Sequence, residues 1–409
     1  MKKLLTVLLS FMLVAVVFTG CKKTTTTPTD TGTTGAKFHI GIVTGTVSQG
    51  EDDLRGGDAL AKEYGTVADG GMIQAVTYPD NFSSELETVI ANIVGLADDP
   101  LMKAIVVNQG VPGTAEAFKE VRAKRSDILL FCGTTEEDPN VLDATADVVT
   151  DVDQVSRGYL LIWAAKQLGA KNFVHISFPR HMSIELTSRR WSIMQKVGED
   201  LGVKTYFETA PDPTSDVGLA GAQQYIVEHV PAWIEKYGKE TAFFSTNSGL
   251  IEPLIRQITK YGGIFIQADV PSPTMGFPGA LGIDLSAEKG NWPAILKKVE
   301  ASVVAAGGSG RLGTWAFSAP YTTTAGLGEY AIRCINGTAK VANMQDLLSA
   351  FEKYTPGAAW NATNYTDLNT NKTDTNHFML YQDTYVFGKG YLGTTALVVP
   401  EKYLTYKAP

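Results

Sequence analysis

The chain has few of the residues that several common functions require. Three cysteines among 409 residues are too few for a disulfide framework. The five histidines include no pair with the i, i+4 spacing of a helical zinc protease motif. Basic residues number 35 against 43 acidic ones, giving a net charge of -8. This balance excludes a general nucleic-acid binder, because such a protein needs a basic face.

Motifs for cofactor and nucleophile chemistry are also missing. The sequence contains no Gly-x-Ser-x-Gly run, and no Walker-type lysine follows a glycine loop. The first strand-to-helix turn, at Gly45, lacks the G-x-G-x-x-G fingerprint of dinucleotide sites. We therefore expect no enzyme activity, no cofactor and no metal site.

What remains is the composition of a globular protein. Hydrophobic residues make up 44% of the chain and charged residues 19%, so global disorder is excluded. At about 150 residues per domain, the length predicts two to three domains.

The first 20 residues have the pattern of a bacterial lipoprotein signal peptide. A short positive start is followed by the nearly apolar residues 4–18, a stretch too short for a transmembrane helix. The ending Phe-Thr-Gly-Cys resembles a lipobox, which implies cleavage before Cys21 and lipidation of its thiol. An ordinary secretory signal with an incidental cysteine is the alternative. Residues 21–36 are rich in threonine and predict a flexible tether, so we expect a membrane-anchored protein of the cell envelope on the extracytoplasmic side.

The other two cysteines lie in apolar surroundings. Cys132 ends an apolar run, and Cys334 lies in a helix-like run. They are interpreted either as two small buried hydrophobic residues or as a disulfide pair.

Short apolar runs alternate with helical patterns along the chain. A first series of strands is expected at residues 38–44, 72–78, 103–108, 127–132 and 147–151, and a second at 172–177, 204–208, 241–245 and 264–267. The helices between them are expected at residues 54–64, 83–96, 114–124, 156–168, 182–201, 218–237 and 252–260. This alternation predicts an α/β protein with two parallel, doubly wound sheets covered on both faces. We expect a first lobe at 37–153, completed by 285–409, and a second lobe at 154–284.

The pattern loosens after residue 307. Helices are expected at 319–336 and 344–354. Residues 360–376 are rich in Asn and Thr and are expected to form a loop, while 381–387 and 391–399 predict terminal strands or an extended wrap.

Polar and aromatic side chains follow the predicted strands at the ends where open parallel sheets bind ligands. Such groups can hydrogen-bond a small solute while rings cover its faces. The alternative for each is a helix cap or turn former. The candidate ligand-binding residues are Thr44, Thr46, Ser48, Gln49, Asn108, Gln109, Thr134, Glu136, Phe178, Arg180, His181 and Asn247.

Arg180 and His181 have two interpretations each. The guanidinium of Arg180 suits a carboxylate or phosphate, or else pairs with Glu185 or with the face between the domains. The imidazole of His181 donates or accepts a hydrogen bond in the site, or else is a residue of a first helical turn.

Five runs carry a resemblance to a family. They are residues 41–49 (GIVTGTVSQ), 78–82 (YPDNF), 175–182 (HISFPRHM), 210–218 (APDPTSDVG) and 271–280 (PSPTMGFPGA). With them, residues 37–402 resemble an uncharacterised group of bacterial lipoproteins known as a domain of unknown function. More distantly, the chain is similar to type I periplasmic binding proteins, including the nucleoside-binding lipoproteins of the basic-membrane-protein group. The resemblance implies two doubly wound lobes joined by crossing strands.

The implied role is capture of a small solute for an ABC importer by lobe closure. The expected partners are a sugar, nucleoside or related metabolite, an ABC permease, and the membrane through the lipid anchor, with no nucleic acid. A membrane-anchored sensor or co-receptor is the first alternative, and an envelope hydrolase the second. The signal sequence and the missing helix-turn-helix oppose a cytoplasmic transcription regulator.

Overall fold

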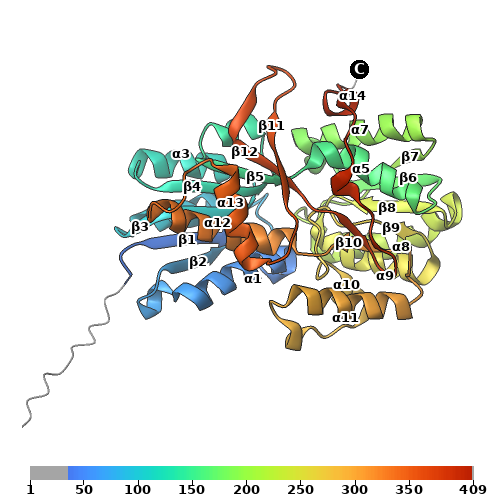
Figure 1. The fold of residues 1–409 in the computed structure, drawn as a ribbon, viewed down its shortest axis with the longest axis horizontal. Coiled ribbons are helices and arrows are strands. Elements are labelled where there is room, and N and C mark those ends of the chain that lie inside the picture. The colour runs from blue at the N-terminus through green and yellow to red at the C-terminus, as the bar shows by residue number, and fades with distance from the viewer. Residues whose placement is uncertain (1–35, 408–409) are drawn as a thin grey trace, which may run out of the picture. The chain divides into compact units, whose positions relative to one another are not determined.

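The computed structural model describes residues 36–407, which form two α/β halves side by side (Figure 1). The expected signal peptide, the lipidation site Cys21 and the tether up to residue 35 lie outside the described residues. The α/β class and the two doubly wound, mostly parallel sheets are confirmed.

The first half is built on a seven-stranded sheet in the order β11-β12-β5-β4-β3-β1-β2. Its strands from β5 to β2 are parallel, and most side chains of β1, β3, β4 and β5 are buried on both faces, which explains the continuous apolar runs in the sequence. The strands are β1 (His39–Thr44), β2 (Ile73–Thr77), β3 (Met102–Gly110), β4 (Leu129–Thr135), β5 (Val148–Val152), β11 (Asn361–Thr366) and β12 (Thr373–Tyr381).

Helices cover both faces of this sheet. Two pack on one face through Val89, Ile93 and Phe118, and three pack on the other through Leu60, Tyr330 and Phe351. The first pair is α2 (Leu86–Gly95) and α3 (Thr114–Lys124), and the second set is α1 (Val47–Tyr64), α12 (Ala319–Ile335) and α13 (Met344–Tyr354). The short α4 (Pro139–Asp143) follows β4. We call this sheet with its helices the first lobe.

The second half is built on a four-stranded parallel sheet in the order β7-β6-β8-β9. Its strands are β6 (Asn172–Ser177), β7 (Lys204–Thr209), β8 (Thr241–Ser245) and β9 (Ile264–Phe265). One face packs against α5 (Gln154–Gln167), α7 (Glu185–Leu201) and α14 (Glu401–Leu404), with the short α6 (Pro179–Met182) preceding α7. The other face packs against α8 (Gly218–Tyr237), α9 (Ile251–Tyr261), α10 (Phe277–Leu281) and α11 (Trp292–Ala305). We call this the second lobe.

Helix α11 departs from the expected boundary at residue 285. Its residues Trp292, Ile295 and Val299 belong to the hydrophobic cluster that contains Ile176 of β6 and Phe243 of β8. We therefore propose that the second lobe extends to about residue 318, and that the first lobe resumes with α12.

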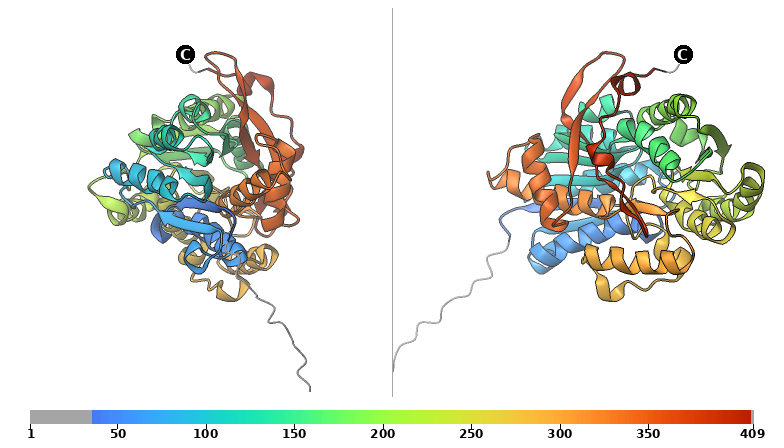
Figure 2. Two further views of the ribbon diagram at one scale, coloured as in Figure 1. Left: turned by 90° about the vertical axis from the view of Figure 1, so that its left-hand side faces the viewer. Right: turned by 45° about the vertical axis from the view of Figure 1, so that its right-hand side comes forward.

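The chain passes between the two lobes three times. It crosses from β5 to α5, from β10 (Gly313–Trp315) to α12, and from β12 to β13 (Thr384–Val386). Strands β10, β13 and β14 (Gly390–Tyr391) form a small antiparallel sheet, and a bridge between Phe265 and Leu312 connects β9 to the segment before β10. The two further views in Figure 2 show these late segments running along the molecule beside both lobes.

The predicted loop at residues 360–376 is wrong. This segment forms β11 and the start of β12, an antiparallel hairpin that joins the first sheet with β12 parallel to β5. Strand β11 ends at Thr366, and β12 begins at Thr373. The polar composition was misleading because β11 is an edge strand whose side chains are mostly only partly buried. The expected terminal strands at 381–387 and 391–399 are reduced to β13 and β14.

Within residues 36–407, no helix is long and apolar enough to cross a membrane. The two cysteines of this part of the chain are free thiols: Cys132 is buried in β4 and Cys334 is half-buried in α12. The interpretation as small hydrophobic residues is therefore correct, and the disulfide alternative is wrong.

A glycine pair in α1 offers a test of the packing between α1 and α12. A Cβ atom on Gly56 would lie 2.6 Å from the carbonyl oxygen of Tyr321 and 2.8 Å from Cβ of Thr324. On the adjacent Gly57, it would meet only Cγ2 of Ile42, at 3.4 Å. We expect Gly56→Ala to lower the free energy of unfolding by about 1–3 kcal/mol because the helices must move apart.

Gly57→Ala is the matched control. Its free energy of unfolding should equal or slightly exceed that of wild type, since alanine has a higher helix propensity than glycine. Urea unfolding of both variants measures the difference. Equal stability of the two variants would show that α1 and α12 are not in close contact.

Candidate functional site

A small cavity lies where the carboxyl ends of the two sheets face each other, and it is called the interlobe cavity below. In each sheet, the strand order reverses beside the first strand of that sheet: β1 lies between β2 and β3, and β6 lies between β7 and β8. Such switch points leave a crevice outside the strand ends. The cavity has sixteen lining residues: Gln49, Tyr78, Phe82, Gln109, Thr134, Thr135, Glu136, Gln154, His181, Ile184, Thr187, Thr246, Asn247, Ser248, Asp269 and Val270.

Six of the twelve predicted ligand-binding residues line this cavity. They come from the ends of five strands, which are β1, β3 and β4 in the first sheet and β6 and β8 in the second, and β4 contributes two of the residues. The six are Gln49, Gln109, Thr134, Glu136, His181 and Asn247.

The other six predicted residues have different positions. Thr44 is buried at the end of β1, and Ser48 is exposed on the surface. Thr46 caps α1 and donates to the carboxylate of Asp80, so the helix-cap alternative describes it. Phe178 lies behind His181, with its ring centroid 4.2 Å from the imidazole.

Asn108 is held inside the first lobe instead of facing the cavity. Its side-chain nitrogen donates to Oδ1 of Asp53 at 2.7 Å and to the hydroxyl of Thr324 at 2.9 Å. Burial, with the adjacent charge of Asp52, raises the pKa of Asp53 to about 8. Gln109 Nε2 donates to the second oxygen of Asp53 at 3.3 Å, so the protonated carboxyl group positions a cavity residue from behind.

Arg180 connects the two lobes at the edge of the cavity. Its guanidinium donates to both oxygens of Asp212 in the second lobe, at 2.7 and 3.2 Å, and to Oε2 of Glu136 in the first lobe, at 2.6 Å. It lies between two rings, 5.3 Å from the centroid of Phe82 and 5.4 Å from that of Phe178. Arg180 therefore does not pair with Glu185, and three of its five N–H groups donate to two carboxylates.

His181 presents a buried ring to the cavity. Its Nδ1 is 3.0 Å from the hydroxyl of Thr246, which in turn contacts the hydroxyl of Ser177 at 2.8 Å. Burial and the charge of Arg180 lower the pKa of His181 to about 3, so the ring is neutral at physiological pH. Its Nε2 has no hydrogen-bond partner within residues 36–407 and lies 3.8 Å from Oε2 of Glu136.

Two buried arginines lie behind the second-lobe wall. Arg190 donates to Oδ1 of Asp269 at 2.5 Å and to the side-chain oxygen of Gln154. Arg157 donates to the carbonyl oxygens of Ala268 and Asp269 at 2.8 and 2.7 Å. These bonds fix Asp269 and Gln154 at the cavity wall, where one oxygen of Asp269 and the amide nitrogen of Gln154 stay unused.

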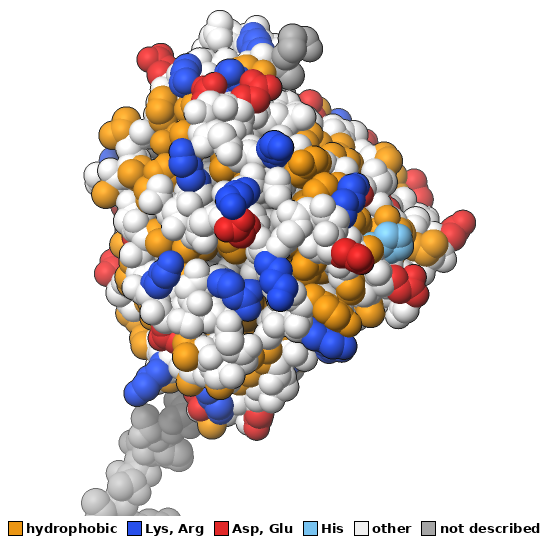
Figure 3. Space-filling view, turned by 90° about the vertical axis from the view of Figure 1, so that its right-hand side faces the viewer, with side chains coloured by type: hydrophobic (Ala, Val, Ile, Leu, Met, Phe, Trp, Pro, Cys, Tyr) orange, Lys and Arg blue, Asp and Glu red, His pale blue; other side chains and the backbone are white. Residues whose placement is uncertain are grey.

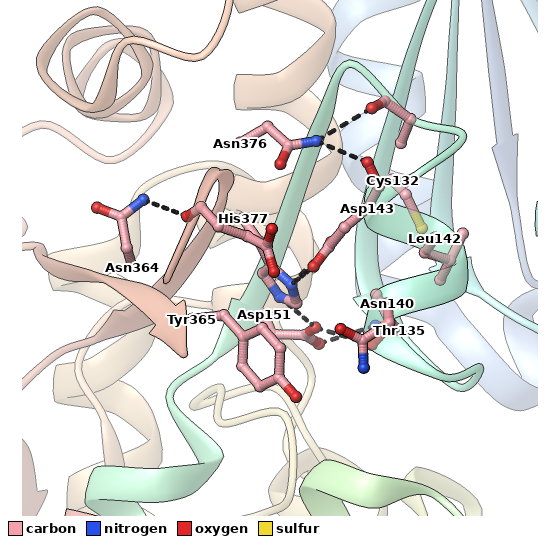
Figure 4. A network of polar contacts seen from close by, with 12 residues as sticks. Cys132, Thr135, Asn140, Leu142, Asp143, Asp151, Asn364, Tyr365, Asn376 and His377 are labelled. Atoms are coloured by element: carbon pink, nitrogen blue, oxygen red, sulfur yellow. Dashed lines mark hydrogen bonds and ion pairs between the residues drawn. The ribbon is translucent and has the colours of Figure 1, made fainter. Parts of the chain in front are cut away.

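A polar network connects the first-lobe wall to the β11–β12 hairpin (Figure 4). Both carboxylate oxygens of Asp151 bond Thr135, through its backbone N–H and its hydroxyl, each at 2.8 Å. The imidazole of His377 in β12 lies between Asp151, at 3.1 Å from Nε2, and Asp143, at 2.9 Å from Nδ1. Burial lowers the pKa of this imidazole, but the two carboxylates outweigh burial and raise it to about 9. A buried ion-paired histidine therefore supports the strand end that carries Thr134 and Thr135.

Ten of the lining residues are absent from the twelve predicted ones, although the sequence also indicated the ring of Phe82 as one near the cleft. Some of them lie within or next to the predicted motifs. Tyr78 and Phe82 belong to the run at residues 78–82, and Thr246 directly precedes the candidate Asn247. Gln154 and Asp269 each follow the end of a strand by a few residues, so the same strand-end argument would have found them. Ile184 and Thr187 belong to the start of α7, and their position depends on the turn of α6, which no sequence signal indicates.

The cavity volume is about 40 Å³, enough for one or two water molecules and far below the roughly 300–1,000 Å³ of a typical ligand pocket. A metabolite would therefore enter only after the lobes have moved apart. Within residues 36–407 no group of histidine, cysteine or carboxylate side chains is arranged to hold a metal ion.

The two lobes with their three crossings have the fold of the type I periplasmic binding proteins. Among solved structures, the chain is similar to a proposed transcriptional regulator from Clostridium difficile 630, with a TM-score of 0.66, 23% identity, and coverage of 86% of this chain and 100% of that one. It is also similar to the substrate-binding protein of a sugar ABC transport system from Bordetella parapertussis 12822, with a TM-score of 0.51, 12% identity, and coverage of 91% and 94%.

The chain belongs to the family described as "Protein of unknown function (DUF3798)", whose model matches residues 38–313. Two uncharacterised proteins of Treponema pallidum (strain Nichols) are similar to it. One is 45% identical over 191 residues, which are 46% of this chain and 86% of the relative. The other is 40% identical over 220 residues, which are 54% of this chain and 100% of the relative.

Proposed function

We propose that the chain is a solute-binding protein of the cell envelope, which captures a small polar molecule in the interlobe cavity. In this proposal it is anchored through a lipid on Cys21 and delivers its ligand to an ABC permease. Binding without chemical turnover is the whole of its activity. The observation that carries the proposal is the cavity between the two switch points, with polar groups from both lobes facing it.

The lining groups suit a ligand with several hydroxyl or amide groups. Gln154 and Asn247 keep a donor available from the second lobe, because each uses its oxygen inside the protein. The oxygens of Gln49 and Gln109 are acceptors from the first lobe, since each amide nitrogen bonds within that lobe. The rings of Tyr78 and Phe82, edge to face with centroids 5.6 Å apart, provide an apolar surface beside them. A sugar, a nucleoside or a related metabolite has this combination of groups.

A melting-temperature screen tests the proposal. A ligand that binds only the native state stabilises it by about 2.7 kcal/mol at one hundred times its dissociation constant. We expect at least one compound from a panel of sugars, nucleosides, amino acids and vitamins to raise the melting temperature. Mass spectrometry of the natively prepared protein would identify a compound that co-purifies. No shift across the panel and no co-purifying compound would argue against a binding protein.

The variant Asn247→Asp separates binding from folding. The carboxylate keeps the acceptor that caps the backbone N–H of Gly249, at 2.9 Å in the wild type, but it removes the donor that faces the cavity. We expect the affinity for the ligand to fall about tenfold, the loss of one hydrogen bond. Asn140→Asp is the control, because the side chain of Asn140 is exposed and is not part of the cavity lining. Isothermal titration of both variants measures the effect, and equal affinities would remove Asn247 from the site.

A further inference from the structure

The first-lobe wall of the interlobe cavity brings two carboxylates, Glu136 and Asp80, and the protonated carboxyl group of Asp53 near one ring. Tyr78 lines the cavity and is 2% exposed. Burial, together with the nearby carboxyl groups of Asp53, Glu136 and Asp80, raises the pKa of its hydroxyl. These acids come from three separate elements: α1, the turn after β2, and the end of β4. The fold therefore brings them together from positions far apart in the sequence.

No cationic side chain lines the cavity, and the two acids of the lining pair with arginines outside it: Glu136 with Arg180 at 2.6 Å and Asp269 with Arg190 at 2.5 Å. Arg180 is shared between Glu136 and Asp212, and it lies at the edge. Elsewhere basic residues are plentiful, since lysine and arginine side chains are spread across the outer face of the second lobe (Figure 3). The lack of a cation in the lining is therefore a property of the cavity and not of the whole surface.

An unpartnered nitrogen in the same wall is an independent sign of a ligand. His181 is 5% exposed, and its Nε2 lies 3.8 Å from Oε2 of Glu136 with no hydrogen-bond partner in the described part of the chain. If Nδ1 carries the proton and donates to Thr246, Nε2 presents a lone pair beside a carboxylate oxygen. Two acceptors at this spacing suit a donor that bonds both, and a protonated amine has up to three N–H donors.

We propose that the solute bound in the interlobe cavity carries a protonated amine, seated between Glu136 and His181 and against the rings of Tyr78 and Phe82. The inference rests on the proposed binding function and adds the charge of the ligand. An ammonium group compensates a buried carboxylate, donates to the unpartnered imidazole nitrogen, and is attracted to the face of an aromatic ring. An anionic ligand is disfavoured because no guanidinium lines the cavity and those of Arg180 and Arg190 beside it are already bonded to carboxylates.

Matched pairs of probes test the charge alone. We would titrate the full chain at pH 6.5 with D-glucosamine and D-glucose, with D-galactosamine and D-galactose, and with putrescine and 1,4-butanediol. Melting temperature and isothermal titration report binding. We expect the amine of at least one pair to bind about tenfold or more tightly than its neutral partner, a ratio typical of one added charge-assisted hydrogen bond.

Charge-removing variants locate the effect. Glu136→Gln should bring the ratio of affinities within a pair close to one, and Asp80→Asn should reduce it without touching the Arg180 contact. Glu240→Gln is the matched control, because Glu240 is exposed and pairs with Lys171 at the opposite end of the second sheet. The control should leave the ratio unchanged.

The outcomes separate this inference from the proposed function. If neutral members bind as tightly as the amines in every pair, or if only neutral compounds of the wider panel bind, the amine assignment is overturned and the binding function stands. If neither the pairs nor the panel bind, both are overturned. If the amine preference persists in Glu136→Gln and in Asp80→Asn, the ammonium site lies elsewhere and the assignment to this wall is wrong.

Discussion

Replacing Arg180 with alanine is expected to lower the free energy of unfolding by about 3 kcal/mol and to let the lobes separate. The side chain holds Asp212 and Glu136 together across the cavity edge, and its removal leaves two mostly buried carboxylates facing each other. Burial raises the pKa of Glu136 even with the guanidinium present, so without it this carboxyl group would take up a proton or move to solvent.

Denaturant unfolding measures the stability change, and small-angle X-ray scattering measures the separation. A second interlobe contact, between the hydroxyls of Thr214 and Ser83 at 2.9 Å, stays in place and limits the opening. Arg180→Lys is the control for charge: it keeps the cation but lacks the planar fork that bonds both acids. We expect Arg180→Lys to recover part of the free energy of unfolding, while its radius of gyration stays close to that of the alanine variant. An alanine variant with wild-type stability and an unchanged radius of gyration would contradict this role.

The largest pH effect is expected at His377. Replacement with glutamine keeps the size and one donor but removes the charge between Asp143 and Asp151. The pKa of His377 in the folded protein is about 9, above the unfolded value of about 6.5. Its stabilising contribution is therefore fully present below pH 6.5 and is lost as the pH rises through 9. A difference of this size corresponds to roughly 3 kcal/mol.

Unfolding of wild type and His377→Gln between pH 6 and pH 10 measures this contribution. The difference between the two proteins should be largest at pH 6 and should shrink towards pH 10. Burial also raises the pKa of Asp143, so measurements below pH 6 would mix two titrations. His229→Gln is the matched control, because the ring of His229 bonds only the carbonyl oxygen of Tyr225 at 2.8 Å. A difference independent of pH would show that His377 is neutral in the folded state.

The central strands could be predicted because burial on both faces gives an unmistakable sequence pattern. In strands such as β3 and β6 nearly every side chain is buried, and each strand contains a short apolar run. The β11–β12 hairpin could not be predicted in this way, since β11 is an edge strand with mostly partly buried side chains and the pairing of β12 with β5 is a contact between distant parts of the chain. The position of α11 in the second lobe likewise depends on tertiary packing.

The site was predictable to the level of strand ends and no further. The rule that ligands bind beyond the strand ends identified Gln109 and Asn247, but it also selected Asn108, whose side chain turns inward to Asp53. Sequence could not indicate that Arg180 would be used by Glu136 and Asp212, because the three residues are 44 and 32 positions apart. Whether a polar side chain serves the ligand or the protein depends on partners that only the fold brings near.

The three crossings between the lobes have a practical consequence for dissecting the molecule. Neither lobe is a continuous stretch of sequence, so no single truncated gene would encode one intact half. A protease nick in any one crossing would leave two covalent connections, and the halves would still travel together through a sizing column. Isolating either half would require joining distant segments with new linkers, for example from Asp151 in β5 to Ala319 in α12.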